Sequence, residues 1–204
     1  MSDVLLIHSS MFGDESKSLG LARELIARLP HKSLVERPLG PDTIPHLDAE
    51  TLTAMRVPEA ARTDRQKELL ALSDTLVGEL EAANTIVLAV PMYNFSISST
   101  LKAWIDHVAW AGRTFRYTAS GPEGLLKGKK VFVASARGGI YSEGPYSVMD
   151  FQEPYIRAVL RFIGLDDVTF VHLEGLSISP EVAAKGLARA RDTLDGLLPS
   201  RAAA

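Results

Sequence analysis

The sequence predicts a doubly wound α/β domain, in which a five-stranded parallel sheet of order 2-1-3-4-5 carries helices on both faces. Five short apolar runs alternate with amphipathic helical patterns along the chain, as in sheets built with crossover helices. The clearest run, residues 85–90, is β-branched and uncharged, which is typical of a strand buried on both faces. Five strands favour this order over a six-stranded dinucleotide-binding arrangement.

The elements follow from these patterns in order. Strands are predicted at residues 4–8, 33–36, 85–90, 131–134 and 168–173. Apolar residues at steps of three and four predict helices at residues 19–29, 69–80, 101–108, 155–162 and 187–197. Thr63 and Gln66 are spaced to form a capping box before the second helix. Gly164 is placed to end the fourth helix, and Pro180 to start the last.

Two segments interrupt the alternation. Residues 40–62 contain three prolines and a short helical patch near residues 52–55, and residues 112–130 contain four glycines, which indicates a hairpin or long loop. Excursions of this length are usually functional or bind a partner. The tail at residues 199–204 is expected to be frayed.

Composition limits the class of protein. The 204 residues are expected to form a single domain, residues 1–204, with 46% apolar and 23% charged residues. A net charge of −3 gives no basic surface for nucleic acid. No run approaches the length of a membrane span, and no signal peptide is recognisable, so we expect a cytoplasmic protein. There is no cysteine, which excludes disulfides and thiolate chemistry, and the histidines lack metal-ligand spacing.

The loop after the first predicted strand, residues 9–18, is rich in hydroxyls and leads into a helix. Hydroxyls and N–H groups at a helix N-terminus bind anions, so Ser16 and Ser18 are candidate phosphate donors and Lys17 adds a charge. The alternative is that Ser16 is only an N-cap, and the acidic pair at residues 14–15 counts against a phosphate. Neither a dinucleotide glycine fingerprint nor a P-loop is present, which favours a terminal monophosphate.

The loop after the third predicted strand consists of Pro91, Met92, Tyr93, Asn94 and Phe95. Ligands of such sheets bind outside the carboxyl ends of the strands. Two aromatic rings and a thioether offer an apolar wall to a flat ring, and exposed N–H groups there can bind its edge. The alternative is a small hydrophobic cluster capping the sheet, which the amide of Asn94 between two aromatics disfavours.

The loop after the fourth predicted strand contains Ala136, Arg137, Gly138 and Gly139. Paired glycines permit positive φ and a close approach of the backbone to a ligand, although alone they indicate only a turn. In a 2-1-3-4-5 sheet the loops after strands one, three and four are neighbours. Phosphate donors, an aromatic wall and a glycine cradle therefore converge on one flat, phosphorylated ligand, and FMN has this chemistry.

Six motifs cover nearly the whole chain in order: Ser-Ser at 9–10, Ser-x-Ser at 16–18, Pro-Met-Tyr-Asn-Phe at 91–95, Thr-Phe-Arg-Tyr-Thr at 114–118, Gly-Pro-Glu-Gly at 121–124 and Arg-Gly-Gly at 137–139. They resemble the bacterial FMN-dependent NADH azoreductases, also described as NAD(P)H:quinone oxidoreductases of the flavodoxin-like fold. The resemblance implies a homodimer, tightly and non-covalently bound FMN, and NADH or NADPH as co-substrate. It also implies ping-pong, two-electron reduction of quinones and aromatic azo compounds.

The same resemblance implies roles for particular residues. Ser10 and residues 16–18 would hold the phosphate and ribityl end of FMN, residues 92–95 would flank its ring, and residues 136–139 would face its pyrimidine side. Relatives often have serine where Ala136 stands, so one hydroxyl contact would be missing. No side chain is assigned as an obligatory acid or base.

The long excursions also suggest an acceptor pocket and a dimer interface. Phe115 and Tyr117 are candidates for an apolar roof over the acceptor, from the same or the neighbouring subunit. With Trp104 and Trp110 they would form an apolar interface surface; the alternative is that both tryptophans lie in the core. Rival functions are a flavodoxin-type electron carrier, a flavin-binding regulatory module and a flavin-free hydrolase. The long excursions and mild net charge argue against the carrier.

Overall fold

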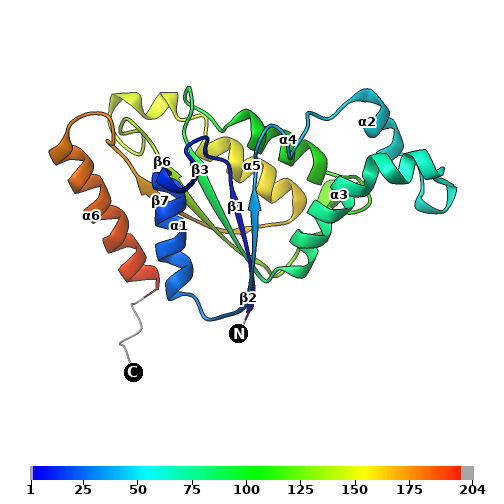
Figure 1. Cartoon of the computed structure of the whole chain (residues 1–204), viewed down its shortest axis with the longest axis horizontal. Helices are drawn as coiled ribbons and strands as arrows, with labels where there is room; N and C mark the ends of the chain where they lie inside the picture. The colour runs from blue at the N-terminus through cyan, green and yellow to red at the C-terminus, as the bar shows by residue number, and fades with distance from the viewer. Residues whose placement is uncertain (1, 199–204) are drawn as a thin grey trace.

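The computed structural model describes residues 2–198 and shows a parallel sheet with helices on both faces (Figure 1). The strands of this sheet are β1 (Ser2–His8), β2 (His31–Pro38), β3 (Thr85–Pro91), β6 (Lys130–Ala136) and β7 (Asp167–Leu173). They lie in the order β2-β1-β3-β6-β7, and each neighbouring pair is parallel. Counted within this sheet alone, that is the predicted order 2-1-3-4-5. The predicted tail at residues 199–204 lies outside the described residues.

Helices cover the two faces of the sheet unequally. One face is covered by α1 (Lys17–Arg28) and α6 (Pro180–Leu197), and the other by α3 (Asp64–Ala82), α4 (Ser99–Val108) and α5 (Glu153–Ile163). Alternate side chains of β6 enter the two cores: Val131 and Val133 pack with α3–α5, and Phe132 and Ala134 pack with α1 and α6.

The predicted helix boundaries follow from local hydrogen bonding. Thr63 and Gln66 form the expected capping box at the start of α3. Gly164 ends α5 in the left-handed conformation, with φ of 99°, which glycine adopts without steric cost. Pro180 is the first residue of α6, and Ser179 caps it.

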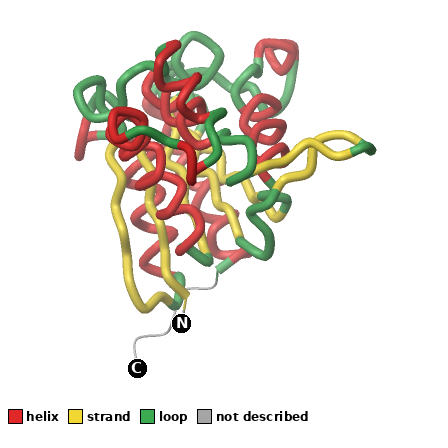
Figure 2. Tube along the Cα trace, turned by 90° about the vertical axis from the view of Figure 1, so that its right-hand side faces the viewer, coloured by secondary structure: helices red, strands yellow, loops and turns green. Residues whose placement is uncertain are grey.

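Both excursions carry secondary structure. The first contains α2 (Ala49–Met55), and the second contains an antiparallel hairpin of β4 (Phe115–Thr118) and β5 (Gly121–Gly124). Figure 2 shows this hairpin extending away from the body of the molecule. Its base is pressed against the end of α5, where a Cβ on Gly124 would lie 2.1 Å from the backbone nitrogen of Gly164.

The two tryptophans lie in the core of the chain. Trp104 and Trp110 are each only 2% exposed, and the indole N–H of Trp110 donates to the carbonyl of Met55 at 3.0 Å. The expectation that they form an exposed interface surface is therefore wrong. Their large apolar area is already covered by α2, α3 and the sheet, as members of the larger core cluster.

Candidate functional site

Three loops at the carboxyl edge of the sheet enclose a cavity of about 310 Å³. They follow β1, β3 and β6, which are neighbours in the sheet, so the strand order brings together segments far apart in the sequence. Two bonds join the loops directly: Met92 N–H donates to the carbonyl of Ala136 at 2.8 Å, and Met11 N–H donates to Tyr93 Oη at 3.3 Å. The lining contains predicted residues Ser10, Ser16, Lys17, Ser18, Pro91, Met92, Tyr93, Ala136 and Gly138, together with Phe12, Glu15, Leu176 and Ser177.

The loop after β1 presents hydroxyls at the start of α1. Ser16 is the N-cap, because its Oγ accepts from the N–H of Leu19 at 3.2 Å. It also shares a 3.0 Å hydrogen bond with Ser18 Oγ, and both residues line the cavity. The N-cap interpretation is thus confirmed without removing these residues from the site, since the first N–H groups of a helix remain free for an anion.

Ser9, which the sequence placed in a motif without a role of its own, adds a further hydroxyl to this loop. Its Oγ is buried and has no hydrogen-bond partner among residues 2–198. Buried polar atoms are normally satisfied, so the unpaired Ser9 hydroxyl directly before Ser10 is available to a polar group of a bound ligand. The adjacent Ser-Ser pair was the available sequence signal.

The acidic pair beside the loop is partly neutralised. Asp14 pairs with Arg23 at 2.8 Å, and Arg23 also reaches Glu36 at 3.3 Å. Glu36 in turn contacts His8 Nε2 at 3.1 Å; burial nevertheless lowers the pKa of His8, outweighing that carboxylate. Only Glu15 of the pair lines the cavity. Of the two acidic side chains that counted against a phosphate, Asp14 therefore no longer does.

The loop after β3 is a tight turn with a strained backbone. Tyr93 and Ser96 exchange two backbone hydrogen bonds, of 3.0 and 3.1 Å, around Asn94 and Phe95. Both central residues have positive φ, 48° and 72°, as in a two-residue turn that normally carries Asn-Gly. Phenylalanine in this conformation is rare and costs about 1–2 kcal/mol. Such strain persists where function requires the side chain.

This turn displays its side chains rather than burying them. Asn94 and Phe95 are exposed, and the Phe95 ring makes an edge contact with Tyr141, with ring centroids 6.2 Å apart. Neither residue lines the cavity of the three loops. Asn94 instead lines an adjoining cavity of about 790 Å³ that also contains Met11, Pro41, Met92 and Tyr93. The wall formed by Met92 and Tyr93 therefore borders both cavities.

The loop after β6 is hydrogen-bonded to the segment that follows β7. The carbonyls of Arg137, Gly138 and Gly139 accept from the N–H groups of residues 176, 177 and 175, at 3.2, 2.9 and 2.9 Å. Among the described residues, the N–H groups of Gly138 and Gly139 have no such partner. Neither glycine has positive φ. Instead, a Cβ on Gly138 would lie 2.9 Å from Ser177 Oγ, so the pair serves close approach, not an unusual backbone conformation.

Arg137 differs most from its expected role. Its side chain is 0% exposed and does not line the cavity. It lies on the face of the sheet covered by α5, where Asp150 Oδ2 and Glu174 Oε1 contact its Nη1 at 3.0 and 3.1 Å. A direct side-chain contact to a ligand in the cavity is excluded by this placement.

The predicted roof residues of the hairpin separate in the structure. Phe115 is 6% exposed and packs against Phe162 of α5, with ring centroids 4.3 Å apart. Tyr117 is 75% exposed and makes an edge contact with Phe115 at 5.5 Å. Neither lines the cavity of the three loops within this chain. Of these two residues, it is Tyr117 that is exposed enough to contact another molecule.

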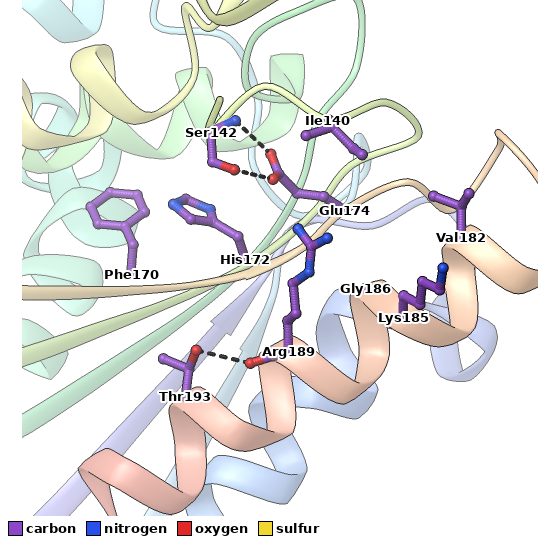
Figure 3. Close-up of a pocket in the computed structure, with 10 residues that line it drawn as sticks. All are labelled: Ile140, Ser142, Phe170, His172, Glu174, Val182, Lys185, Gly186, Arg189 and Thr193. Atoms are coloured by element: carbon purple, nitrogen blue, oxygen red, sulfur yellow. Dashed lines mark hydrogen bonds between the residues drawn. The ribbon is translucent and has the colours of Figure 1, made fainter. Parts of the chain in front are cut away.

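A separate cavity of about 360 Å³ lies between β7 and α6 (Figure 3). It is lined by His172, Glu174 and Arg189 among others, and contains none of the predicted site residues. In the part of the chain from residue 2 to 198, no cluster of three or more His, Asp or Glu side chains is placed to hold a metal ion. Over the same residues, no helix is long and apolar enough to cross a bilayer.

Fold and site together define a flavodoxin-like α/β protein with a ligand cavity at the carboxyl edge of its sheet. Residues 2–198 match a protein family that is described as having a flavodoxin-like fold. An FMN-dependent NADH:quinone oxidoreductase from Herminiimonas arsenicoxydans is 48% identical over 204 residues, covering 98% of this chain and 100% of the relative. One from Azotobacter vinelandii is 48% identical over 198 residues, covering 95% and 98%. The chain belongs to this family of FMN-dependent NADH:quinone oxidoreductases.

Solved structures agree with this assignment. An FMN-dependent NADH-azoreductase from Bacillus anthracis str. Ames Ancestor, in complex with FMN, aligns with a TM-score of 0.82 and 26% identity, covering 97% of this chain and 100% of that one. An azoreductase from Bacillus anthracis str. Sterne aligns with a TM-score of 0.86 and 25% identity, covering 98% and 99%. The resemblance seen in the sequence is confirmed. The chain is an oxidoreductase, which decides against a carrier, a regulatory module or a hydrolase.

Proposed function

We propose that this chain binds FMN and uses NADH, or NADPH, to reduce quinones and to cleave aromatic azo compounds. The observation that carries the proposal is the convergence of three loops on one cavity, with hydroxyls at one side, an apolar wall at another and Gly138, whose N–H has no partner among the described residues, at a third. The names of the relatives support it. The cytoplasmic location expected from the sequence is part of the same proposal.

The residues of the cavity fit a flavin mononucleotide. Ser10, Ser16 and Ser18, with the first N–H groups of α1 and the charge of Lys17, would hold the phosphate and ribityl end. The orphaned hydroxyl of Ser9 offers one more donor there. Only a monophosphate suits this end, because the loop lacks the glycines with which a dinucleotide is held.

The remaining loops fit the ring. Pro91, Met92 and Tyr93 line the apolar side of the cavity, and the turn of Asn94 and Phe95 continues this wall outward. The free N–H groups of Gly138 and Gly139 would bind the pyrimidine edge. Ala136, which is 8% exposed, contributes no hydroxyl.

Bound FMN would supply the two-electron redox chemistry between the nicotinamide and the acceptor. The chain's own residues would bind the flavin and orient it and the two substrates. The cavity bordered by Met92, Tyr93 and Asn94 is open enough to take a flat ligand beside the wall. Nicotinamide and acceptor would occupy this space in turn, which gives a ping-pong order, and an azo bond requires two such cycles. We assign no side chain as acid or base; solvent or an ordered water would supply the protons.

We also propose a homodimer that completes the acceptor site. Tyr146, Val148 and Phe151 are 67%, 76% and 57% exposed, and the N–H of Phe151 donates to the carbonyl of Phe95 at 3.1 Å. An exposed apolar segment that is hydrogen-bonded to the turn of Asn94 and Phe95 is suited to form a subunit interface. Exposed Tyr117 would roof the neighbouring site, whereas buried Phe115 would support it.

Analysis of the released flavin and of turnover tests the proposed function. The purified chain should carry or take up one FMN, identified by mass spectrometry, and should oxidise NADH with a quinone as acceptor. Stoichiometric FAD, or no flavin uptake, would refute the cofactor assignment, and bound FMN without turnover would refute the reaction. Light scattering that showed an active monomer would refute the dimer.

A further inference from the structure

Arg137 is buried completely, which is unusual for arginine. Its Nη1 contacts carboxylate oxygens of Asp150 and Glu174 at 3.0 and 3.1 Å, and its Nε donates to Gln152 Oε1 at 3.0 Å. Glu153 lies farther away, 3.9 Å from Nη2. One guanidinium thus joins the end of β6 to the residues that start α5 and to the residue that follows β7.

Glu174 connects this guanidinium to the far side of the loop. Its carboxylate accepts from the N–H groups of Tyr141 and Ser142 at 2.9 and 3.1 Å, and from Ser142 Oγ at 2.5 Å. Figure 3 shows Ser142 turned toward Glu174. Burial alone would raise the pKa of Glu174, but these donors and Arg137 together hold it below its usual value. The carboxylate is therefore charged, and it holds residues 141–142 to Arg137.

Asp150 fixes the other side. Its Oδ1 accepts from the N–H groups of Gln152 and Glu153 at 2.9 and 3.0 Å, which caps the start of α5. Because its second oxygen contacts Arg137, the N-terminus of α5 and the loop after β6 are held by the same carboxylate. The loop is anchored at Arg137, at residues 141–142 and through its carbonyls.

None of these anchors uses the N–H groups of Gly138 and Gly139. With its carbonyls bound by residues 175–177, the segment of Gly138 and Gly139 has free N–H groups, and Gly138 lines the cavity. A buried ion pair is a weak source of stability, since desolvation offsets its attraction. Its value here is geometric: the planar fork of arginine fixes several oxygens at once, which lysine cannot do.

We propose that Arg137 is a positioning residue for the flavin: with Glu174 it sets the orientation of the Gly138 and Gly139 N–H groups toward the ring, without touching the cofactor. This role rests on the proposed function. It predicts that breaking the cluster weakens binding of the ring and spares binding of the phosphate.

The experiment compares two flavins that share the ring. FMN and riboflavin are titrated into the apoproteins of wild type, Arg137→Lys, Glu174→Gln and Ser16→Ala, with fluorescence quenching as the readout. Arg137→Lys and Glu174→Gln should weaken both flavins equally, by about tenfold to a hundredfold, the effect of one or two hydrogen bonds to a charged or partly charged edge. Ser16→Ala should weaken FMN much more than riboflavin.

Two further measurements separate positioning from general damage. Amide hydrogen exchange of apoprotein should show faster exchange at Tyr141 and Ser142 in Glu174→Gln, with β1 and β3 unchanged. The midpoint potential of bound FMN should become more negative in Arg137→Lys, because fewer donors stabilise the reduced ring. Arg113→Lys is the matched control, since Arg113 also bridges two carboxylates, of Asp74 and Glu81, away from the site.

The outcomes are distinct. Wild type that binds no FMN would refute the proposed function and the positioning role with it. Wild type that binds FMN, with unchanged affinity for both flavins and an unchanged potential in folded Arg137→Lys and Glu174→Gln, would refute the positioning role alone. Should Arg137→Lys fail to fold, Glu174→Gln decides the same question, because it removes the ion pair and keeps one acceptor for the backbone.

Discussion

Replacing Gly139 by valine adds bulk where the loop has no room. A Cβ on Gly139 would lie 3.0 Å from Cε2 and Cζ of Tyr141 and 3.1 Å from its Oη, whereas carbon atoms pack at about 3.5–4.0 Å. The Tyr141 ring must therefore move by about 0.5–1 Å. Its freedom is limited, because the N–H of Tyr141 is bound to Glu174 at 2.9 Å and its ring packs on Phe95.

The expected result is weaker FMN binding with an intact fold. Overpacking of this kind costs about 1–3 kcal/mol, and where the Tyr141 ring does not yield, the backbone at Gly139 must shift and carry its N–H away from the flavin. Losing one such hydrogen bond corresponds to about tenfold to a hundredfold in affinity. The backbone at Gly139 is not left-handed, so valine introduces no φ strain and the sheet below should be unaffected.

Titration of FMN into wild-type and Gly139→Val apoprotein measures the effect, with circular dichroism to confirm folding. Gly78→Val is the matched control, since apart from its chain neighbours and the nearby backbone of α3 itself no heavy atom lies within 4 Å of a Cβ at that position. Unchanged FMN affinity in a folded Gly139→Val protein would show that the Arg137–Gly139 segment is only a turn. The placement of the flavin edge at this loop would then be wrong.

Three more predictions concern the wall, the sheet edge and the hairpin. Phe95→Gly relieves a φ of 72°, worth about 1–2 kcal/mol, but gives back about 0.5–1 kcal/mol of chain entropy. Its urea unfolding free energy should thus stay close to that of wild type while the KM for quinone rises; an unchanged KM would exclude the ring from the acceptor site. Hydrogen bonds from His172 and, to a smaller extent, from Arg157 lower the pKa of Glu153 from 4.5 to about 2 against the effect of burial, so stability from this carboxylate is present above pH 4.5 and is lost as the pH falls toward 2. Glu153→Gln should flatten that loss in thermal unfolding at pH 6 and pH 3, and an identical acid slope would contradict the assignment. Gly164→Ala places a Cβ 2.8 Å from the backbone of Gly124 at a φ of 99°, so unfolding should require at least about 1 kcal/mol less; a fully stable variant would show that the hairpin base yields easily.

The sequence predicted the elements whose pattern is local. Residues 85–90 indicated a buried strand, and every residue of β3 is buried. Residues 33–36 underestimated β2, which runs from His31 to Pro38, because this edge strand is largely exposed and its polar ends carry no apolar pattern. The three loops were found because five strands alternating with helices favour this strand order, which makes the loops neighbours.

The sequence could not predict which polar groups tertiary structure brings together. Arg137 beside two glycines suggested ligand contact, and its burial depends on carboxylates at residues 150 and 174, supplied by other elements. The partner of Asp14, Arg23, lies more than two turns away along the chain. Trp104 could not be assigned to core or interface from its side chain, because both environments favour tryptophan.

The convergence of the loops after β1, β3 and β6 also sets the order of events during synthesis. The cavity includes Ser10 and Ser177, which lie far apart in the sequence, so it is incomplete until both segments have left the ribosome. Contacts between such distant segments form late, because loop closure must precede them. The nascent chain must therefore expose the wall at residues 91–95 to solvent before any cofactor can cover it. A flavin could therefore occupy this cavity only after the segment around Ser177 has packed against the other loops.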